Sequence, residues 1–172
     1  RLGRFAGARF QYLAANVVRS DGKQIFPGTV LKRFGPISIR FIGMTLNETG
    51  TLVTPSGVAG LTFANEAASA NALVPALKAQ GADAIVLLIH QGGKPDVNFR
   101  QSGCDGLTGP ILGILDKLDP AISVVVSGHT HYAYACEIER GGASRLLTSA
   151  GRYGYLVTDI RLAFDPSTRA LI

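Results

Sequence analysis

Short apolar runs alternate with polar, glycine-rich stretches along this chain, and two of the runs stand out. Residues Ala84–Ile89 and Ile122–Val126 consist almost wholly of alanine, isoleucine, leucine and valine. Runs of this length and β-branched composition are typical of buried strands. Glycines follow each run within three residues and allow the backbone to turn. Both runs are therefore predicted to be buried strands that end in loops.

A helix is predicted before each of these strands, which gives the alternation of elements that is typical of an α/β protein. Residues 63–80 are rich in alanine and have leucines at helical spacing, an N-cap candidate at Asn65 and a stop at Gly81. Pro75 lies inside this segment and is expected to kink or divide the helix. Residues 107–118 carry a second apolar stripe at helical spacing.

Strand patterns dominate the rest of the chain. Further strands are predicted at residues 12–18, 30–34, 37–43, 134–139, 145–149 and 155–164. The pair on either side of Gly35 and Pro36 reads as a hairpin, whereas residues 47–60 are rich in threonine, glycine and proline and are predicted to be a surface loop. Because no repeat or linker divides the sequence, residues 1–172 are predicted to form a single α/β unit that becomes β-rich toward its end.

Composition and charge narrow the class of protein. With 47% hydrophobic and 17% charged residues, the chain has the composition of a globular domain and not of a disordered segment. Its net charge of +5 comes from scattered basic residues, so no nucleic-acid partner is predicted. No apolar run reaches the length of a membrane span, and no signal peptide is recognisable. Because the only methionine is Met44, the chain is expected to be a processed protein or a fragment of a longer one.

The three histidines of the chain all lie at the ends of strand-like runs. His90 closes the first buried run, and His129 and His131 follow the second, two positions apart. In open α/β sheets, ligands bind at the carboxyl ends of the strands, and neutral imidazole is the commonest metal ligand. The pattern favours a metal site formed by these three side chains. A single histidine after a strand, as at His90, is also typical of a hydrogen-bonded structural residue.

The segments around these histidines resemble a known family. Residues 82–93 (ADAIVLLIHQGG) and 127–131 (SGHTH) are similar to the last two metal-binding motifs of the calcineurin-like metallophosphoesterases. Residues 10–17 (FQYLAANV), 39–46 (IRFIGMTL) and 107–111 (LTGPI) resemble its bacterial 5'-nucleotidase and 2',3'-cyclic-nucleotide 2'-phosphodiesterase branch. The resemblance implies a β-sandwich flanked by helices, of which residues 1–172 would be the C-terminal portion, incomplete at the N-terminus.

The resemblance also implies a chemistry. Enzymes of this family hydrolyse phosphoesters, in this branch nucleoside 5'-monophosphates or 2',3'-cyclic nucleotides, with water activated by two divalent ions. His90, His129 and His131 match family ligands for zinc, manganese or iron. The expected partners are a small nucleotide substrate and a separate C-terminal domain that binds the nucleotide. The expected location is periplasmic or secreted.

Three motifs of the family do not occur in the chain: the Asp-x-His strand end, the Gly-Asp-x-x-Asp segment and the Gly-Asn-His-Glu segment. The catalytic residues are therefore expected in a preceding segment of a longer protein. Residues 1–172 alone are expected to be inactive and to bind one metal ion weakly or none. Two alternatives stay open, namely a hydrolase of nucleotide-sugar diphosphates or another small phosphoester, and a non-catalytic fragment or degenerate domain that binds a metal or ligand.

The two cysteines, Cys104 and Cys136, have no Cys-x-x-Cys spacing, which argues against a zinc-thiolate site. In the fold that the resemblance implies, the two positions could meet. A disulfide would persist in a secreted or periplasmic member of the family. The resemblance therefore favours a Cys104–Cys136 disulfide, and two buried free thiols are the alternative.

Overall fold

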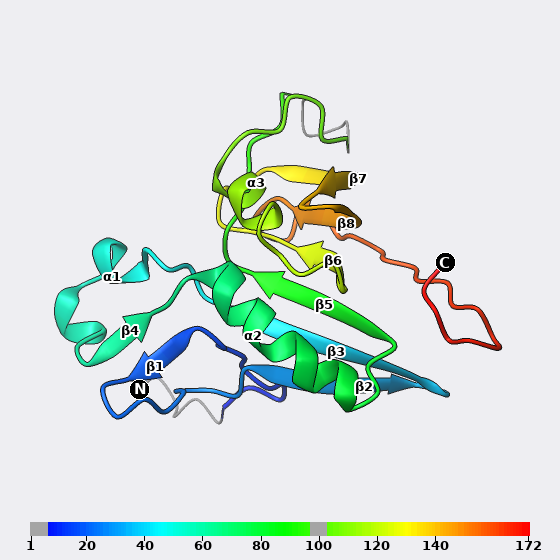
Figure 1. Cartoon of the computed structure of the whole chain (residues 1–172). Helices are drawn as coiled ribbons and strands as arrows, with labels where there is room; N and C mark the ends of the chain where they lie inside the picture. The colour runs from blue at the N-terminus through cyan, green and yellow to red at the C-terminus, as the bar shows by residue number, and fades with distance from the viewer. Residues whose placement is uncertain (1–6, 97–102) are drawn as a thin grey trace.

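The computed structural model describes residues 7–96 and 103–172, and within them a six-stranded mixed sheet forms the centre of the fold (Figure 1). The strands are β2 (Thr29–Phe34), β3 (Ile37–Met44), β5 (Ala84–Ile89), β6 (Ile122–Val126), β7 (Ala133–Arg140) and β8 (Ala143–Ala150). Their order is β2-β3-β5-β6-β8-β7, with a parallel centre and an antiparallel strand at each edge. The mixed α/β class expected from the sequence is confirmed.

The two apolar runs lie at the centre of this sheet, with the bounds predicted for them. β5 pairs in parallel with β3 on one side and with β6 on the other, and β6 pairs in parallel with β8. Strands in this position need apolar residues on both faces because both faces are covered. Since the four central strands run in one direction, their carboxyl ends meet at one edge of the sheet.

One face of the sheet is covered by α2 (Glu66–Ala79) and α3 (Pro110–Leu115); Figure 1 shows α2 lying across β3 and β5. The core beneath these helices includes the following buried residues: Ile42, Ala70, Val74, Leu77, Ile85, Leu87, Ile111, Leu115, Ile122, Val125 and Leu147. The apolar stripes of both predicted helices therefore face the sheet. The side chain of Asn71 ties the helices together, because it donates to the carbonyl of Lys117 and accepts from the backbone N–H of Asp119.

The helix α2 is capped as predicted but begins later. Asn65 Oδ1 accepts a hydrogen bond from the backbone N–H of Ala68, and Gly81 follows the helix with a φ of 75°. The three residues before the cap belong instead to a short strand, β4 (Leu61–Phe63). The predicted division of the helix at Pro75 does not occur. A proline removes one backbone hydrogen bond, and the burial of the neighbouring apolar side chains holds the two halves together.

The helix α3 is shorter than the predicted 107–118. Gly109 has a φ of 112° and ends the preceding extended segment, and Pro110 then occupies the first helical turn, where its missing N–H costs nothing. After Leu115 the chain continues in turns whose backbone bonds span three residues, from Lys117 to Ile114 and from Leu118 to Leu115. The apolar stripe therefore extends beyond the helix itself.

The opposite face of the sheet carries a smaller core of Ile39, Ala84, Val86 and Val124. Ile160, Leu162 and Phe164 pack against it from the C-terminal segment. The prediction of a strand at residues 155–164 is wrong, because this segment forms no ladder and only Phe164 makes an isolated bridge, to Leu171. The alternation of apolar and polar residues is real, but it serves side-chain packing against the sheet.

The remaining elements lie beside the sheet, at the left of Figure 1. β1 (Val17–Arg19) is shorter than the predicted strand at 12–18 and pairs with β4. Residues 47–60, which were predicted to be a surface loop, contain the short helix α1 (Thr49–Leu52) and a 3-10 turn at Pro55–Gly57. The buried side chain of Asn16 connects this region to the sheet, because it accepts from the N–H of Thr45 and donates to two backbone carbonyls.

A buried arginine closes the far end of the sheet. Arg145, in β8, is 1% exposed, and its guanidinium donates to the backbone carbonyls of Leu118, Asp119, Ile122 and Arg140. These carbonyls lie in the turn before β6, at the first residue of β6 and at the last residue of β7, so one side chain satisfies acceptors at two ends of the sheet's connections. In the part of the chain that the structure describes, no helix is long and apolar enough to cross a membrane.

Candidate functional site

The three histidines lie at the carboxyl edge of the sheet, as the sequence predicts. His90 directly follows β5, and His129 and His131 lie in the loop after β6. Because β5 and β6 are adjacent and parallel, the ring centroids of His90 and His129 are 5.1 Å apart, in an edge-on arrangement. All three side chains are exposed. The sheet therefore brings imidazoles from two separate segments to one solvent-accessible place.

The loop after β6 is tightly folded. His129 and His131 have φ values of 69° and 66°, in the left-handed region that side chains other than glycine seldom occupy. Backbone of this kind costs on the order of 1–3 kcal/mol per residue and is typical of functional sites. The His131 ring lies near that of Tyr153, with centroids 5.9 Å apart.

Tyr134, in β7, ties the two histidine loops together. Its hydroxyl accepts from the backbone N–H of Gly93 at 3.0 Å and lies 2.7 Å from Ser127 Oγ. Because Ser127 Oγ donates its own proton to the carbonyl of Thr148, the Tyr134 hydroxyl must donate to Ser127. The side chain of Tyr134 is 1% exposed, so these bonds form away from water. The hydroxyl therefore fixes the loop after β5 relative to the end of β6.

Further contacts hold these two loops against each other. Thr130 Oγ1 donates to the carbonyl of Gly93 at 2.7 Å, and the N–H of Gly128 donates to the carbonyl of Gln91 at 3.3 Å. A Cβ added to Gly92 would lie 2.2 Å from the carbonyl oxygen of Gly128, so only glycine fits there. The positions of His90 and His129 are consequently coupled through backbone and hydroxyl contacts.

The electrostatics of the site favour neutral imidazole at His90. Partial burial lowers the pKa of His90 below its ordinary value, and the positive charges of protonated His129 and His131 lower it further. A neutral imidazole is the form that binds a metal ion.

The three histidines do not form a complete set of metal ligands among the described residues. Within residues 7–96 and 103–172, no three or more histidine, cysteine, aspartate or glutamate side chains are placed so that they could hold one ion. His90 and His129 come together, whereas the ring of His131 lies toward Tyr153. The chemistry of imidazole suits zinc, manganese or iron, but the described residues contribute no carboxylate to the cluster.

Aromatic and cationic side chains begin beside His131, with Tyr153 nearest, and no sequence pattern predicted them. Tyr153 and Tyr155 are 74% and 79% exposed, and the guanidinium of Arg152 lies 5.1 Å from the Tyr153 ring. Lys94 lies 5.8 Å from the ring of Tyr132. The signal that could have drawn attention to the first group is the Gly-Arg-Tyr-Gly run, because paired glycines mark unusual backbone.

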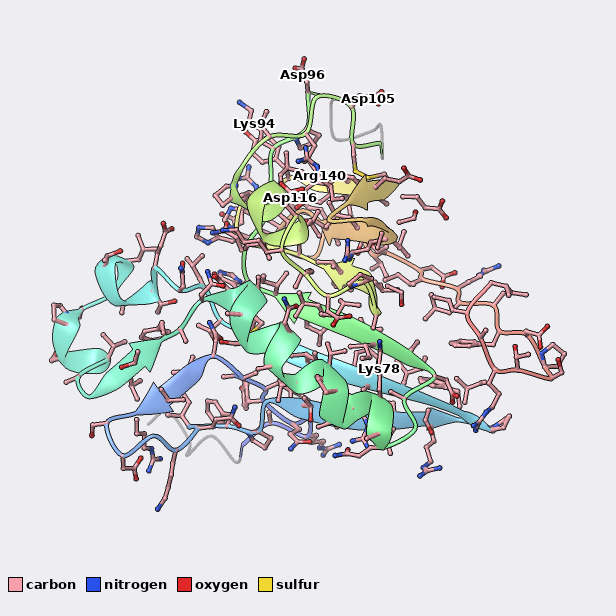
Figure 2. The ribbon with its side chains drawn as sticks, viewed as in Figure 1. Lys78, Lys94, Asp96, Asp105, Asp116 and Arg140 are labelled. Carbon is pink, nitrogen blue, oxygen red and sulfur yellow. A yellow bond between two sulfur atoms is a disulfide. The ribbon has the colours of Figure 1, made fainter. Side chains whose placement is uncertain are left out.

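A disulfide fixes β7 beside the loop that precedes α3. Cys104 and Cys136 are bonded, with their Cα atoms 5.9 Å apart, which is the pairing expected from the resemblance. Figure 2 shows the bond in yellow near the labelled pair Asp116 and Arg140, whose side chains form an ion pair at 3.1 Å. The disulfide and the ion pair both hold β7, the strand that carries Tyr134, against the rest of the fold.

The chain is similar to two curated proteins over much of its length, although no family model matches it. It is 24% identical over 169 residues to Endonuclease YhcR of Bacillus subtilis, which covers 98% of this chain and 13% of that protein. It is 27% identical over 128 residues to Cell wall protein Lmo0130 of Listeria monocytogenes, covering 69% and 16%. The chain thus spans less than a fifth of the length of either relative.

Solved structures of phosphoesterases share this fold. The 5'-nucleotidase precursor from Thermus thermophilus aligns with a TM-score of 0.69 and 22% identity, covering 96% of this chain and 32% of that one. The NAD nucleotidase of Haemophilus influenzae aligns with a TM-score of 0.67 and 21% identity, covering 95% and 29%. The calcineurin-like phosphoesterase YfkN of Bacillus subtilis aligns at 0.64 and 21%, covering 84% and 47%. This chain therefore has the fold of the calcineurin-like metallophosphoesterases, as the motifs indicated.

Proposed function

We propose that residues 1–172 are the C-terminal portion of the catalytic domain of a two-metal phosphoesterase. Its substrates are nucleoside 5'-monophosphates, 2',3'-cyclic nucleotides or both. The observation that carries this proposal is the convergence of His90 and His129, 5.1 Å apart, at the carboxyl ends of adjacent parallel strands of a phosphoesterase fold. Divalent ions held at this edge would activate water and neutralise charge on the phosphoryl oxygens.

The residues of this chain contribute ligands and the scaffold that positions them. His90, His129 and His131 are the proposed ligands, with the neutral imidazole of His90 already favoured by its surroundings. The hydroxyls of Tyr134 and Thr130 hold the two ligand loops at a fixed separation. Positioning of this kind matters, because the loss of a supporting contact to a metal ligand commonly lowers metal affinity or activity about 10–100-fold.

The remaining ligands and the groups that stabilise the transition state are proposed to come from a preceding segment of a longer protein. The family motifs rich in aspartate and asparagine do not occur among the 172 residues, and the described histidines have no carboxylate partner. The small share of each curated relative that the chain covers also supports this proposal. On this basis, residues 1–172 alone bind a divalent ion weakly and release no phosphate.

A nucleotide substrate is supported by the names of structural neighbours, which include 5'-nucleotidases and an NAD nucleotidase. A periplasmic or secreted location is supported by the Cys104–Cys136 disulfide, because such bonds persist in oxidising compartments. The likeness to a protein called a cell wall protein points the same way.

The test is phosphate release from 5'-AMP by the complete protein with added manganese or zinc. We expect metal-dependent turnover that falls by roughly a hundredfold or more in His129→Ala and His131→Ala. His131→Gln should retain part of the activity, because an amide oxygen can still act as a ligand. Lys78→Ala is the control, since Lys78 is exposed on α2. Figure 2 shows it away from Lys94, which lies in the loop after β5.

Three results would contradict the proposal. Full activity of His129→Ala would mean that this histidine is not a ligand. Metal-dependent turnover by residues 1–172 alone would mean that the catalytic residues lie within the chain. A complete protein that binds manganese in calorimetry but hydrolyses no phosphoester would instead favour a non-catalytic domain.

A further inference from the structure

We propose that residues 156–162 form one strand of a second sheet, which a preceding segment of the longer protein builds over the face of the central sheet opposite α2 and α3. We call residues 156–162 the unpaired segment. The inference rests on the proposed function for the existence of a preceding segment. It goes beyond that function, because it names the surface of this chain to which the preceding segment binds.

The unpaired segment has the geometry of a strand. Side-chain exposure alternates along Thr158–Phe164, where Ile160 and Leu162 are partly buried and the residues between them are exposed. On the outer side, Asp159 and Arg161 form an ion pair at 3.0 Å. Side chains two positions apart point to the same side of an extended backbone. The segment therefore has one apolar side, which packs on the central sheet, and one polar side.

The backbone of the unpaired segment has no hydrogen bond to other described residues. Bonding stops at Tyr155, whose N–H donates to the carbonyl of Arg152, and resumes at Ala163, whose carbonyl accepts from the N–H of Ile172. A row of free N–H and C=O groups on an extended segment is a template for a further strand. The segment therefore has the side-chain pattern of a strand and lacks only the neighbouring backbone.

The space under the unpaired segment is not filled. A cavity of about 420 Å³ lies between the segment and the central sheet, and all the side chains that line it are apolar, among them Phe41, Val126 and Ile160. Protein interiors leave few voids larger than a water molecule. A sheet that packs face to face on another, about 10 Å away, places every second side chain in such a space. Further strands beside the segment would therefore fill the cavity.

The first described residues lie on the same side of the sheet, which identifies the preceding segment as the partner. Phe41 lines the cavity, and the alternation of β3 places Gly43 on that face too. A Cβ added to Gly43 would lie 2.3 Å from the Cβ of Leu13, so the chain crosses this face at Leu13. Just before it, Phe10 and Tyr12 are 68% and 50% exposed. A segment that precedes them therefore enters from the side of the cavity, with exposed aromatic rings beside it.

Hydrogen–deuterium exchange of the complete protein tests the ladder directly. We expect amides of the unpaired segment to exchange roughly a hundredfold or more slowly than those of residues 152–154, which are exposed and also make no backbone bond through their N–H groups. Successive amides of a strand point to opposite sides, so an edge strand protects every second amide and a central strand protects them all. Exchange as fast as in residues 152–154 throughout the segment would overturn the inference.

A pair of proline variants tests the ladder by stability. Thr158→Pro and Asp159→Pro each remove one N–H, and the two N–H groups point to opposite sides of the strand. In the complete protein, at least one of them should lower the urea midpoint by roughly 0.5 M relative to Thr158→Ala or Asp159→Ala, the matched controls. Proline variants that both match their alanine controls would contradict the ladder.

Cross-linking identifies the partner. A photo-reactive benzophenone amino acid replaces Val157, which is 91% exposed. We expect a cross-link to a peptide that precedes Arg1 in the same chain. A cross-link to a second copy or to a peptide that follows Ile172 would overturn the inference, and so would the absence of any cross-link outside residues 1–172.

None of these measurements needs turnover, so they separate this inference from the proposed function. Slow exchange and the expected cross-link in a protein that hydrolyses no phosphoester would support the second sheet and overturn the proposed function. Metal-dependent hydrolysis of 5'-AMP by a protein whose unpaired segment exchanges rapidly would support the proposed function and overturn the second sheet.

Discussion

The two faces of the central sheet differ in how completely they are covered. Beneath α2 and α3, side chains such as Ile42, Leu87 and Val125 are fully buried. On the opposite face the C-terminal segment leaves a cavity of about 420 Å³, and Phe34 at its margin is 59% exposed. We call these the closed face and the open face. The closed face holds the continuous core that a domain needs for stability.

The candidate site lies at the edge of the sheet, beyond both faces. Along β5, Leu87 and Ile89 pack into the core of the closed face, Val86 packs into that of the open face, and His90 follows the last residue of the strand. Gln91 is buried and lines a cavity with residues of both helices. The comparison teaches that the alternation of β5 builds a core on each face, while the candidate site lies past the end of the strand, outside both cores.

The largest expected effect comes from a matched pair of leucine substitutions, one on each face. Leu87→Ala removes a fully buried side chain of the closed face and should lower the free energy of unfolding by about 2–5 kcal/mol. Leu162→Ala removes a partly buried side chain of the open face and should cost about 1 kcal/mol or less. Urea unfolding followed by circular dichroism measures both. Equal losses would mean that the C-terminal segment closes its face as tightly as the helices do.

Removal of the disulfide tests the same comparison from the closed side, because Cys104 and Cys136 both pack against its core. The bond closes a loop with a sequence separation of 32. In the chain-entropy description such a loop contributes about 3–4 kcal/mol. The double variant Cys104→Ser, Cys136→Ser should lose this stability in the same unfolding assay. Two alkylatable thiols in the native protein, detected by mass spectrometry of non-reduced peptides, would refute the bond itself.

The smallest of the three effects concerns the link between the closed core and the histidine loops. Tyr134→Phe leaves the buried Gly93 N–H and the Ser127 hydroxyl without this partner and should lower the free energy of unfolding by about 1–3 kcal/mol. Tyr132→Phe is the control, since the Tyr132 hydroxyl makes no hydrogen bond to the described residues, and its effect should stay within about 0.5 kcal/mol. In the complete protein, Tyr134→Phe should also lower turnover, which Tyr132→Phe should not.

The sequence predicted the structure correctly where the local residue pattern and the tertiary role of a segment agree. β5 and β6 have the predicted bounds because each strand is apolar throughout and ends at a turn signal. Asn65 and Gly81 delimit α2 through backbone preferences that act within a few residues. The position of the three histidines at one edge followed from the parallel arrangement of the strands that precede them.

Prediction failed where the outcome depends on distant partners. Residues 155–164 have the alternation of a strand, yet a ladder also needs a neighbouring backbone, and the described chain supplies none along this segment. No local signal shows that the hydroxyl of Tyr134 reaches Gly93, 41 positions earlier. The exposed tyrosines near His131 were missed for a related reason, because only the folded chain brings Tyr153 beside that ring.

The buried guanidinium of Arg145 has a consequence for the order in which the protein folds. Its acceptors at Leu118, Asp119 and Ile122 lie 27, 26 and 23 positions earlier in the chain. During synthesis, the carbonyls of the turn that leads into β6 can therefore bond only to water until β8 emerges and delivers the fixed N–H donors of Arg145. We expect β6 and β8 to dock in a single step, so that the loop with His129 and His131, which lies between them in the sequence, takes shape late. In nascent chains that end before residue 145, the three histidines would then lie on segments that are not yet held together.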